Sequence, residues 1–141
     1  MSTTRKMLTG FALLGAIVCL AFSAGKTFRE LQMRRTVKRA GGFVKALEQY
    51  HQKTGRYPES PEVPIARIMA TSFGSTVSSL NASDGWGRSF RYMSSGDSYV
   101  LWSVGRNGVT DRMPGGGEFE NYDFDLIAVS GDVWQGPSGF F

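Results

Sequence analysis

The sequence has very little of the side-chain chemistry that enzymes and zinc centres use. It contains one histidine, His51, and one cysteine, Cys19, in 141 residues. A single cysteine excludes an intramolecular disulfide, and the two residues leave almost no room for a catalytic triad or a zinc site. No phosphate-binding loop, dinucleotide fingerprint or nucleophile elbow is present. The sequence therefore predicts a protein that is not an enzyme, with His51 at the surface or packed on the domain.

Charge is absent from residues 7–25, and proline is absent before Pro58. An apolar run of about 20 residues is long enough to cross a bilayer as a helix. The two basic residues before it, Arg5 and Lys6, are typical of a signal anchor or a secretory signal. We expect a leader at residues 1–10 and the transmembrane part of a helix at residues 11–25.

Two alternatives stay open for this segment. Cleavage after Ser23 would suit the small residues Ala21 and Ser23, although no polar break follows the run. The flank after the run is more basic than the leader, which by itself would favour the opposite orientation in the membrane.

Residues 26–54 continue as a basic amphipathic helix, because apolar side chains recur there at helical spacing. Gly55 is a typical C-cap residue and Pro58 stands beyond it, so the helix should end there. The pair Gly41-Gly42 is costly inside a helix and predicts a bend or a close approach to the domain.

Charge is unevenly divided along the chain. Residues 26–53 carry eight Lys/Arg against two Glu, which is +6, and residues 54–141 carry six Arg against ten Asp/Glu, which is −4. With Arg5 and Lys6 these values add up to the net charge of +4. Such a basic helical stalk favours contact with water, with acidic lipid or with acidic neighbouring proteins. Nucleic-acid binding would need a reader module behind a basic patch, so we expect no nucleic-acid partner.

Residues 55–141 are expected to form a small globular α/β domain. Three prolines within residues 58–64 predict irregular structure, and a short helix is expected near residues 65–73. The sequence thus predicts an α+β fold, in which the long N-terminal helix, transmembrane half plus amphipathic half, packs on a small antiparallel sheet. Three or four strands are expected, at residues 89–93, 98–104, 124–129 and 132–135, with hairpin loops at 94–97 and 130–131.

An oxygen-rich, glycine-rich stretch lies between the second and third expected strands. Calcium takes six to eight oxygen ligands, and glycines let backbone carbonyls turn inward, so this stretch could bind calcium. It lacks the EF-hand spacing, and a solvated acidic loop is the alternative. Its oxygen-bearing side chains are those of Asn107, Asp111, Glu118, Glu120, Asn121, Asp123 and Asp125.

Four stretches resemble, in the expected order, the type IV pilins and the pseudopilins of type II secretion systems. The last two are similar to segments of the major pseudopilin, and a Gly-rich acidic loop ending in Asp125-Leu-Ile follows them. The four are Arg5-Lys6 with Gly10-Phe11 before the apolar run, Gly55-Arg-Tyr-Pro58, Asp84-Gly-Trp-Gly-Arg-Ser-Phe-Arg-Tyr92, and Tyr99-Val-Leu-Trp-Ser-Val-Gly-Arg-Asn-Gly108.

The resemblance implies a pilin-like fold and a structural role in a filament used for protein secretion across the outer membrane. Prepilin peptidase would cut between Gly10 and Phe11 and methylate the new N-terminus. The chain would cross the bacterial inner membrane once, with its C-terminal domain in the periplasm. Its expected partners are other pseudopilin or pilin-like subunits, the inner-membrane assembly platform, prepilin peptidase and membrane lipid.

Two positions depart from the family pattern. The family's glutamate near the mature N-terminus is Gly15 here, so a minor or divergent subunit is expected at least as much as the major one. The aspartate that binds calcium in major pseudopilins is Asn107 here, which lowers the charge of the site. The ligands that the resemblance implies are the Val104 carbonyl, Asn107 and Asp125, with Asp123 or Asp111.

A signal-anchored periplasmic module that binds a small ligand or a polysaccharide is the alternative function. Its stacking surface would consist of Trp86, Trp102 and Trp134. An exposed, coplanar set of these rings would favour the binding module, whereas burial in the sheet would favour the filament subunit.

Overall fold

The structure is a computed structural model that describes residues 3–73, 80–111 and 116–138, with side chains from Ser23 onward. It has the α+β fold that the sequence predicts. The chain divides into two compact units, Met1–Leu31 and Gln32–Phe141. The helix α1 (Thr3–Thr54) begins in the first unit and ends in the second.

The predicted membrane segment lies largely beyond the described side chains. In the part of the chain whose side chains are described, no helix is long and apolar enough to cross a membrane. Most of residues 11–25 lies outside that part, and so do the predicted leader and the processing residues Gly10 and Phe11. These expectations stay predictions.

The second half of α1 forms one wall of the hydrophobic core. Its buried stripe begins at Gln32 and Met33, whereas the apolar side chains of Phe28 and Leu31 before it are 57% and 45% exposed. At the other end the Gly55 N–H donates to the His51 carbonyl over 2.7 Å, with φ at 77°. This left-handed glycine ends the helix as expected.

The Gly41-Gly42 pair does not interrupt α1, which is helical throughout this region. Of its two possible roles, the structure supports the close approach. A Cβ built on Gly42 would lie 3.4 Å from the Leu80 side chain, whereas one on Gly41 would meet nothing within 4 Å.

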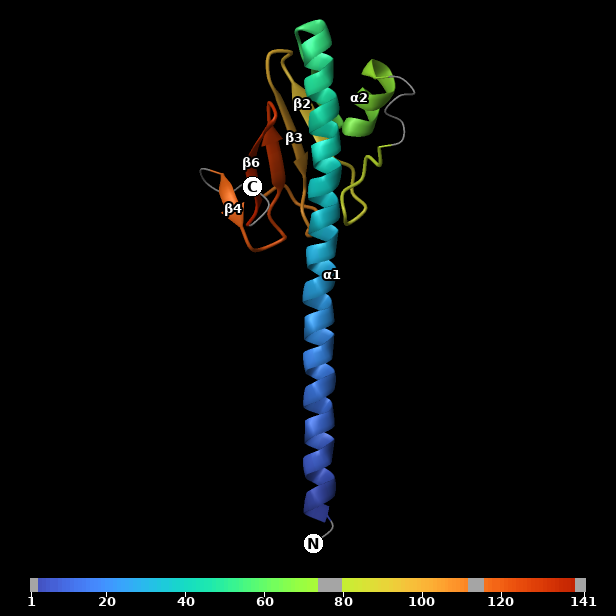
Figure 1. Ribbon diagram of the computed structural model, residues 1–141, viewed down its shortest axis with the longest axis vertical. Helices are drawn as coiled ribbons and strands as arrows, with labels where there is room; N and C mark the ends of the chain where they lie inside the picture. Colours follow the sequence, from blue (N-terminus) through green and yellow to red (C-terminus); the bar gives the residue numbers. More distant parts are fainter. Residues whose placement is uncertain (1–2, 74–79, 112–115, 139–141) are drawn as a thin grey trace. The chain divides into compact units, whose positions relative to one another are not determined.

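Among the described residues the sheet has six strands, where the sequence predicts three or four. Figure 1 shows strands of this sheet beside α1. Their order is β1-β2-β3-β5-β6-β4, and all neighbours are antiparallel except β4 and β6. The strands are β1 (Ser60–Pro64), β2 (Arg91–Ser94), β3 (Tyr99–Ser103), β4 (Gly117–Phe119), β5 (Leu126–Val129) and β6 (Asp132–Pro137).

The strand β1 corrects the expectation of irregular structure around the prolines. It contains Pro61 and Pro64 and pairs with β2, with a register shift between Ser60 and Val63. Proline lacks the N–H that a central strand needs, but an edge strand has one side on which no partner requires it. The prolines therefore fix the place of β1 at the edge of the sheet.

Both predicted hairpins are confirmed. In the loop between β2 and β3, the Gly96 N–H donates to the Ser94 hydroxyl over 2.9 Å, and φ of Gly96 is 94°. Between β5 and β6, Ser130 and Gly131 have φ of 49° and 94°. Positive φ at both residues is the conformation of a type I′ turn, one of the two that tight two-residue hairpins favour.

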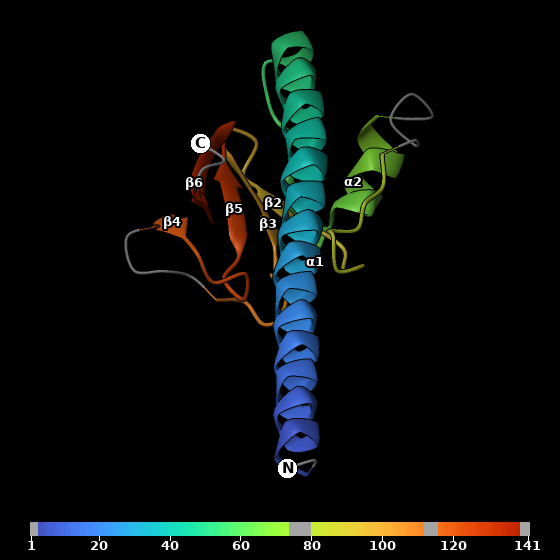
Figure 2. The ribbon, with the colours of Figure 1, turned by 60° about the horizontal axis from the view of Figure 1, so that its bottom comes forward.

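The core lies between the sheet and the two helices, α1 and α2 (Ile65–Ser72; Figure 2). The cross-strand neighbours Tyr92, Leu101 and Ala128 pack in one cluster with Phe43 of α1 and Ile68 of α2. This burial of large side chains is the main source of stability of the domain.

Candidate functional site: the docking loop and the acidic loop

The segment that we call the docking loop, residues 83–88, lies directly on α1. The Gly85 N–H donates to the Thr36 hydroxyl over 2.8 Å, and that hydroxyl donates to the Gln32 carbonyl over 2.9 Å. A Cβ on Gly85 would lie 1.9 Å from the Gln32 carbonyl oxygen. Only glycine permits this contact between loop and helix backbone.

The carboxylate of Asp84 organises the docking loop from within. It is 1% exposed, and one oxygen accepts the N–H groups of Trp86 and Arg88 over 2.9 and 2.8 Å. The other oxygen accepts the Ser103 hydroxyl of β3 over 2.8 Å. Asp84 therefore connects the loop that lies on α1 to the end of a central strand.

The side chain of Arg39 takes part in the same contact. The sequence places it among the basic residues on the polar side of the helix. In the structure it is half-buried and donates to the carbonyls of Ser83 and Asp84 over 2.9 and 2.8 Å. A guanidinium that binds two carbonyls keeps the helix and the docking loop in one register.

The segment that we call the acidic loop, residues 104–125, begins with a tight turn after β3. The Gly108 N–H donates to the Val104 carbonyl over 3.2 Å, and φ is 61° at Gly105 and 75° at Gly108. The Arg88 guanidinium donates to the Gly105 carbonyl over 3.2 Å and lies against Gly108, 2.6 Å from where a Cβ would be. Arg88 thus connects the docking loop to the acidic loop.

A second arginine binds the far end of the acidic loop. The Arg106 guanidinium donates to both carboxylate oxygens of Asp123, over 2.7 and 2.8 Å. These hydrogen bonds raise the pKa of Arg106 above its usual value. The Arg106 N–H also donates to the Tyr122 carbonyl over 2.8 Å, so side chain and backbone hold the same contact.

The structure brings some of the predicted calcium ligands together. The Asn107 amide contacts the Asp111 carboxylate over 2.5 Å, and the Asp125 N–H donates to the Asp111 carbonyl over 3.2 Å. The Asp125 side chain is fully buried, while the Asp123 carboxylate faces Arg106. Within the described residues, no group of three or more His, Cys, Asp or Glu side chains is placed to hold a metal. The calcium site stays a prediction.

The histidine and the three tryptophans that the sequence singles out lie in different parts of the domain. The His51 ring stacks on Tyr57 with centroids 4.4 Å apart, which fits the expectation of a domain-packing histidine. Trp102 is 4% exposed in β3, Trp86 is half-buried in the docking loop, and Trp134 is 41% exposed in β6. The three tryptophans therefore form no exposed, coplanar set.

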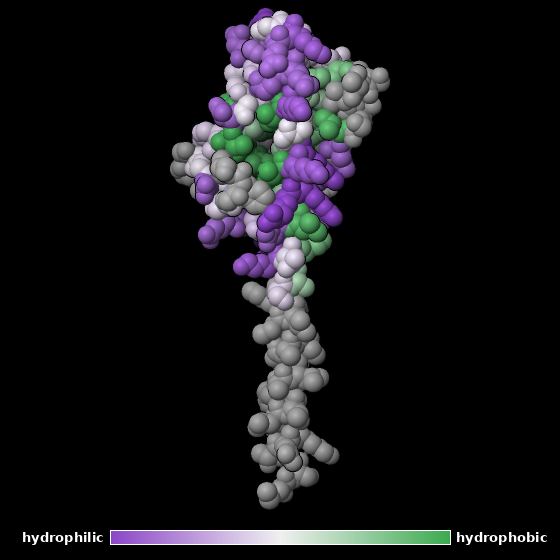
Figure 3. Space-filling view, in the orientation of Figure 1, coloured by the Kyte–Doolittle hydropathy of each residue, from purple (hydrophilic) through white to green (hydrophobic). Residues whose placement is uncertain are grey.

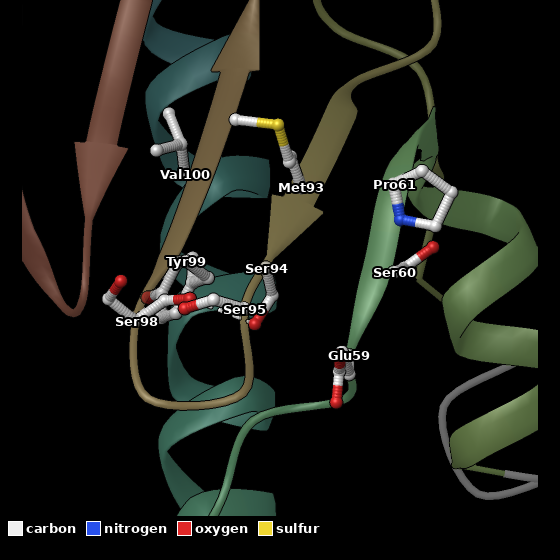
Figure 4. Close-up of a pocket in the computed structure, with 9 residues that line it drawn as sticks. All are labelled: Glu59, Ser60, Pro61, Met93, Ser94, Ser95, Ser98, Tyr99 and Val100. Atoms are coloured by element: carbon white, nitrogen blue, oxygen red, sulfur yellow. Dashed lines mark hydrogen bonds between the residues drawn. The ribbon is translucent and has the colours of Figure 1, made fainter.

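An open cavity of about 810 Å³ lies between β1 and the β2–β3 hairpin (Figure 4). Its lining contains several serines, the apolar side chains of Met93 and Val100, and one carboxylate, that of Glu59. It contains no tryptophan, so it does not supply the stacking surface that the alternative function needs.

Compared with protein-family models, curated proteins and solved structures, the chain matches none of them. The family resemblance accordingly rests on the four sequence stretches alone.

Residues 84–88 of the docking loop belong to one of the stretches that resemble the family, but the sequence does not predict their contact with α1. One signal was available, since Gln32 and Thr36 stand at helical spacing with Met33 and Ala40 and so belong to the buried side of α1. A polar residue in such a stripe needs a partner. The identity of that partner, the backbone of Gly85, 49 residues further on, depends on the tertiary fold.

Proposed function

We propose that the chain is a non-enzymatic structural subunit of a type II secretion pseudopilus or of a type IV pilus-like filament. Residues 11–25 would anchor it in the bacterial inner membrane, and residues 55–141 would form its periplasmic domain. The absence of the family's glutamate at Gly15 favours a minor or divergent subunit.

The observation that carries the proposal is the length of α1 relative to what covers it. The helix has 52 residues, yet its buried side chains begin only at Gln32. Among the described side chains of residues 23–31 none is buried, and Phe28 and Leu31 are exposed. Exposed apolar side chains on such a helix suit contact with lipid or with other subunits, and repeated contacts of one kind that do not close produce filaments.

Basic side chains give further support. Within residues 32–54, the exposed side of α1 carries Arg34, Arg35, Lys38 and Lys45, and hydrophilic side chains gather along it (Figure 3). The domain that follows the helix, residues 55–141, has the opposite net charge, −4. In a filament, the basic helix of one subunit and the acidic domain of its neighbour would attract each other.

Processing by prepilin peptidase provides the sharpest test. We expect the mature chain to begin at a methylated Phe11, and Gly10→Val to leave the leader in place and to prevent copurification with filament subunits. The matched control is Gly25→Val, because a Cβ on Gly25 would meet nothing within 4 Å. Mass spectrometry of the purified N-terminus and a pulldown would measure both effects. Cleavage after Ser23, or an uncut chain that is monomeric in membranes, would refute the proposal.

A further inference from the structure

The acidic loop carries more negative than positive charge. Between Val104 and Asp125 the sequence has five carboxylates, at positions 111, 118, 120, 123 and 125, and two arginines, at positions 106 and 112. Like charges brought close together repel one another, and a loop of this kind is commonly closed by a cation. In this chain the described contacts supply a different source of positive charge.

Two guanidinium groups occupy the turn that opens the loop. Arg88 binds the Gly105 carbonyl and covers Gly108, so it holds the near side of the turn. Arg106 extends from the turn and binds Asp123 through both oxygens, which joins the two ends of the loop. Arg88 is itself held by Asp84, whose carboxylate accepts the Arg88 backbone N–H over 2.8 Å.

We propose that Arg88 and Arg106 together do in this chain what a bound cation would do, so that the acidic loop closes without calcium. The Asp123 carboxylate uses both oxygens for the bidentate pair with Arg106. Asn107 contributes no negative charge, and its Oδ1 accepts the Val109 N–H over 2.9 Å. The ligand set is therefore weaker in charge, and part of it is engaged by the protein itself.

The chemistry of arginine suits this role. Its planar, permanently charged guanidinium matches the two oxygens of a carboxylate, as Arg106 and Asp123 illustrate. Unlike a bound ion, it cannot be removed by a chelator or diluted out. The proposal concerns the folding of the isolated subunit and does not depend on filament assembly.

The experiment uses the full chain in detergent micelles, with added calcium or with a chelator. Hydrogen exchange of residues 104–111 and 116–125 reports on loop closure, and thermal unfolding reports on the domain. We expect identical exchange protection and an identical Tm in both conditions. In Arg106→Gln we expect loss of protection in the acidic loop and a decrease in Tm of up to roughly 4–8 °C.

Arg91→Gln is the matched control. Arg91 binds Glu62 with two nitrogens, over 3.0 and 2.6 Å, and its side chain is 36% exposed, close to the 38% of Arg106. Because this pair connects β1 and β2, its loss should leave protection of the acidic loop unchanged. Asp123→Asn removes the carboxylate partner of the same ion pair. In this variant the acidic loop should lose exchange protection, as in Arg106→Gln.

Two results would overturn the proposal. The first is a wild-type Tm that rises with calcium and falls with chelator. The second is full protection of the acidic loop in both Arg106→Gln and Asp123→Asn. Failure of the protein to enter filaments would count against the proposed function and would leave this inference intact.

Discussion

Asp84 and Asp123 each hold a glycine-containing loop in place, but they do so in different surroundings. Asp84 is 1% exposed and accepts three neutral donors, two backbone N–H groups and a hydroxyl. The Asp123 side chain is 27% exposed and binds one charged donor, Arg106. Asp84 thus acts within a buried network, and Asp123 acts through an ion pair near water.

The difference sets how much each loop contributes to stability. Buried donors that lose their acceptor cost free energy because water cannot replace it. An exposed ion pair contributes little, because water and salt compete with it. The docking loop should therefore be part of the cooperative core, and the acidic loop a locally held segment.

The largest expected effect comes from Gly85→Ala. The new Cβ would fall 1.9 Å from the Gln32 carbonyl oxygen, so α1 and the docking loop would have to separate. We expect the free energy of unfolding to fall by about 3 kcal/mol or more, measured by urea denaturation. Gly41→Ala is the control and should be stabilising by about 1 kcal/mol. A Gly85→Ala variant of wild-type stability would show that the loop is not docked on the helix.

Asp84→Ala should have the next largest effect. It removes the acceptor of three hydrogen bonds in a buried site, at about 1 kcal/mol each, so a loss of about 3 kcal/mol is expected. Asp84→Asn keeps an oxygen for the two backbone donors and should cost less. Equal losses in the two variants would indicate that the carboxylate acts by its charge.

The alkaline stability of the protein tests the core beneath both loops. Burial raises the pKa of Tyr92 from 10.0 to about 12, so the phenol stays protonated in the folded state while it ionises in the unfolded state. The contribution of Tyr92 to stability should therefore be constant below about pH 10 and be lost between about pH 10 and about 12. The raised pKa of Arg106 keeps the Asp123 pair intact in this range.

Tyr92→Phe separates these contributions. The variant loses the hydrogen bond from the hydroxyl to the Pro58 carbonyl, 2.8 Å long, which should cost about 1 kcal/mol at neutral pH. Its stability should then decline less steeply above pH 10. Parallel stability curves for wild type and variant, measured by urea denaturation across this range, would contradict the assignment to Tyr92.

Asp123→Ala should have the smallest effect on global unfolding. The pair with Arg106 is partly exposed, so we expect a decrease in Tm of a few degrees. This decrease should become smaller as salt is added. Scanning calorimetry at several salt concentrations would measure it. A large decrease that does not respond to salt would place the acidic loop in the cooperative core, like the docking loop.

Much of the secondary structure could be predicted from the sequence, because local signals specify it. Gly55 at the end of α1 and Ser130-Gly131 between β5 and β6 have the conformations that their turn chemistry requires. The strands β1 and β4 were missed for different reasons. The prolines of β1 predict irregular structure there. The strand β4 has only three residues and depends on its parallel pairing with β6.

The contacts of the candidate site were less accessible to sequence reasoning. Predictions from composition grouped the oxygen-bearing residues of the acidic loop, and the structure does bring Asn107 and Asp111 together. Composition could not show that Asp123 faces Arg106, since 17 residues separate them along the chain. Nor could it show that the Arg39 side chain donates hydrogen bonds to two carbonyls of the docking loop.

The prolines of β1 have a consequence for crowding. Exposed strand edges promote aggregation by adding strands from other molecules, and proline blocks such addition because it offers no N–H. One edge of this sheet is β1, with Pro61 and Pro64, and the other is β4, only three residues long. Copies held at high local density should therefore resist association through the edges of their sheets.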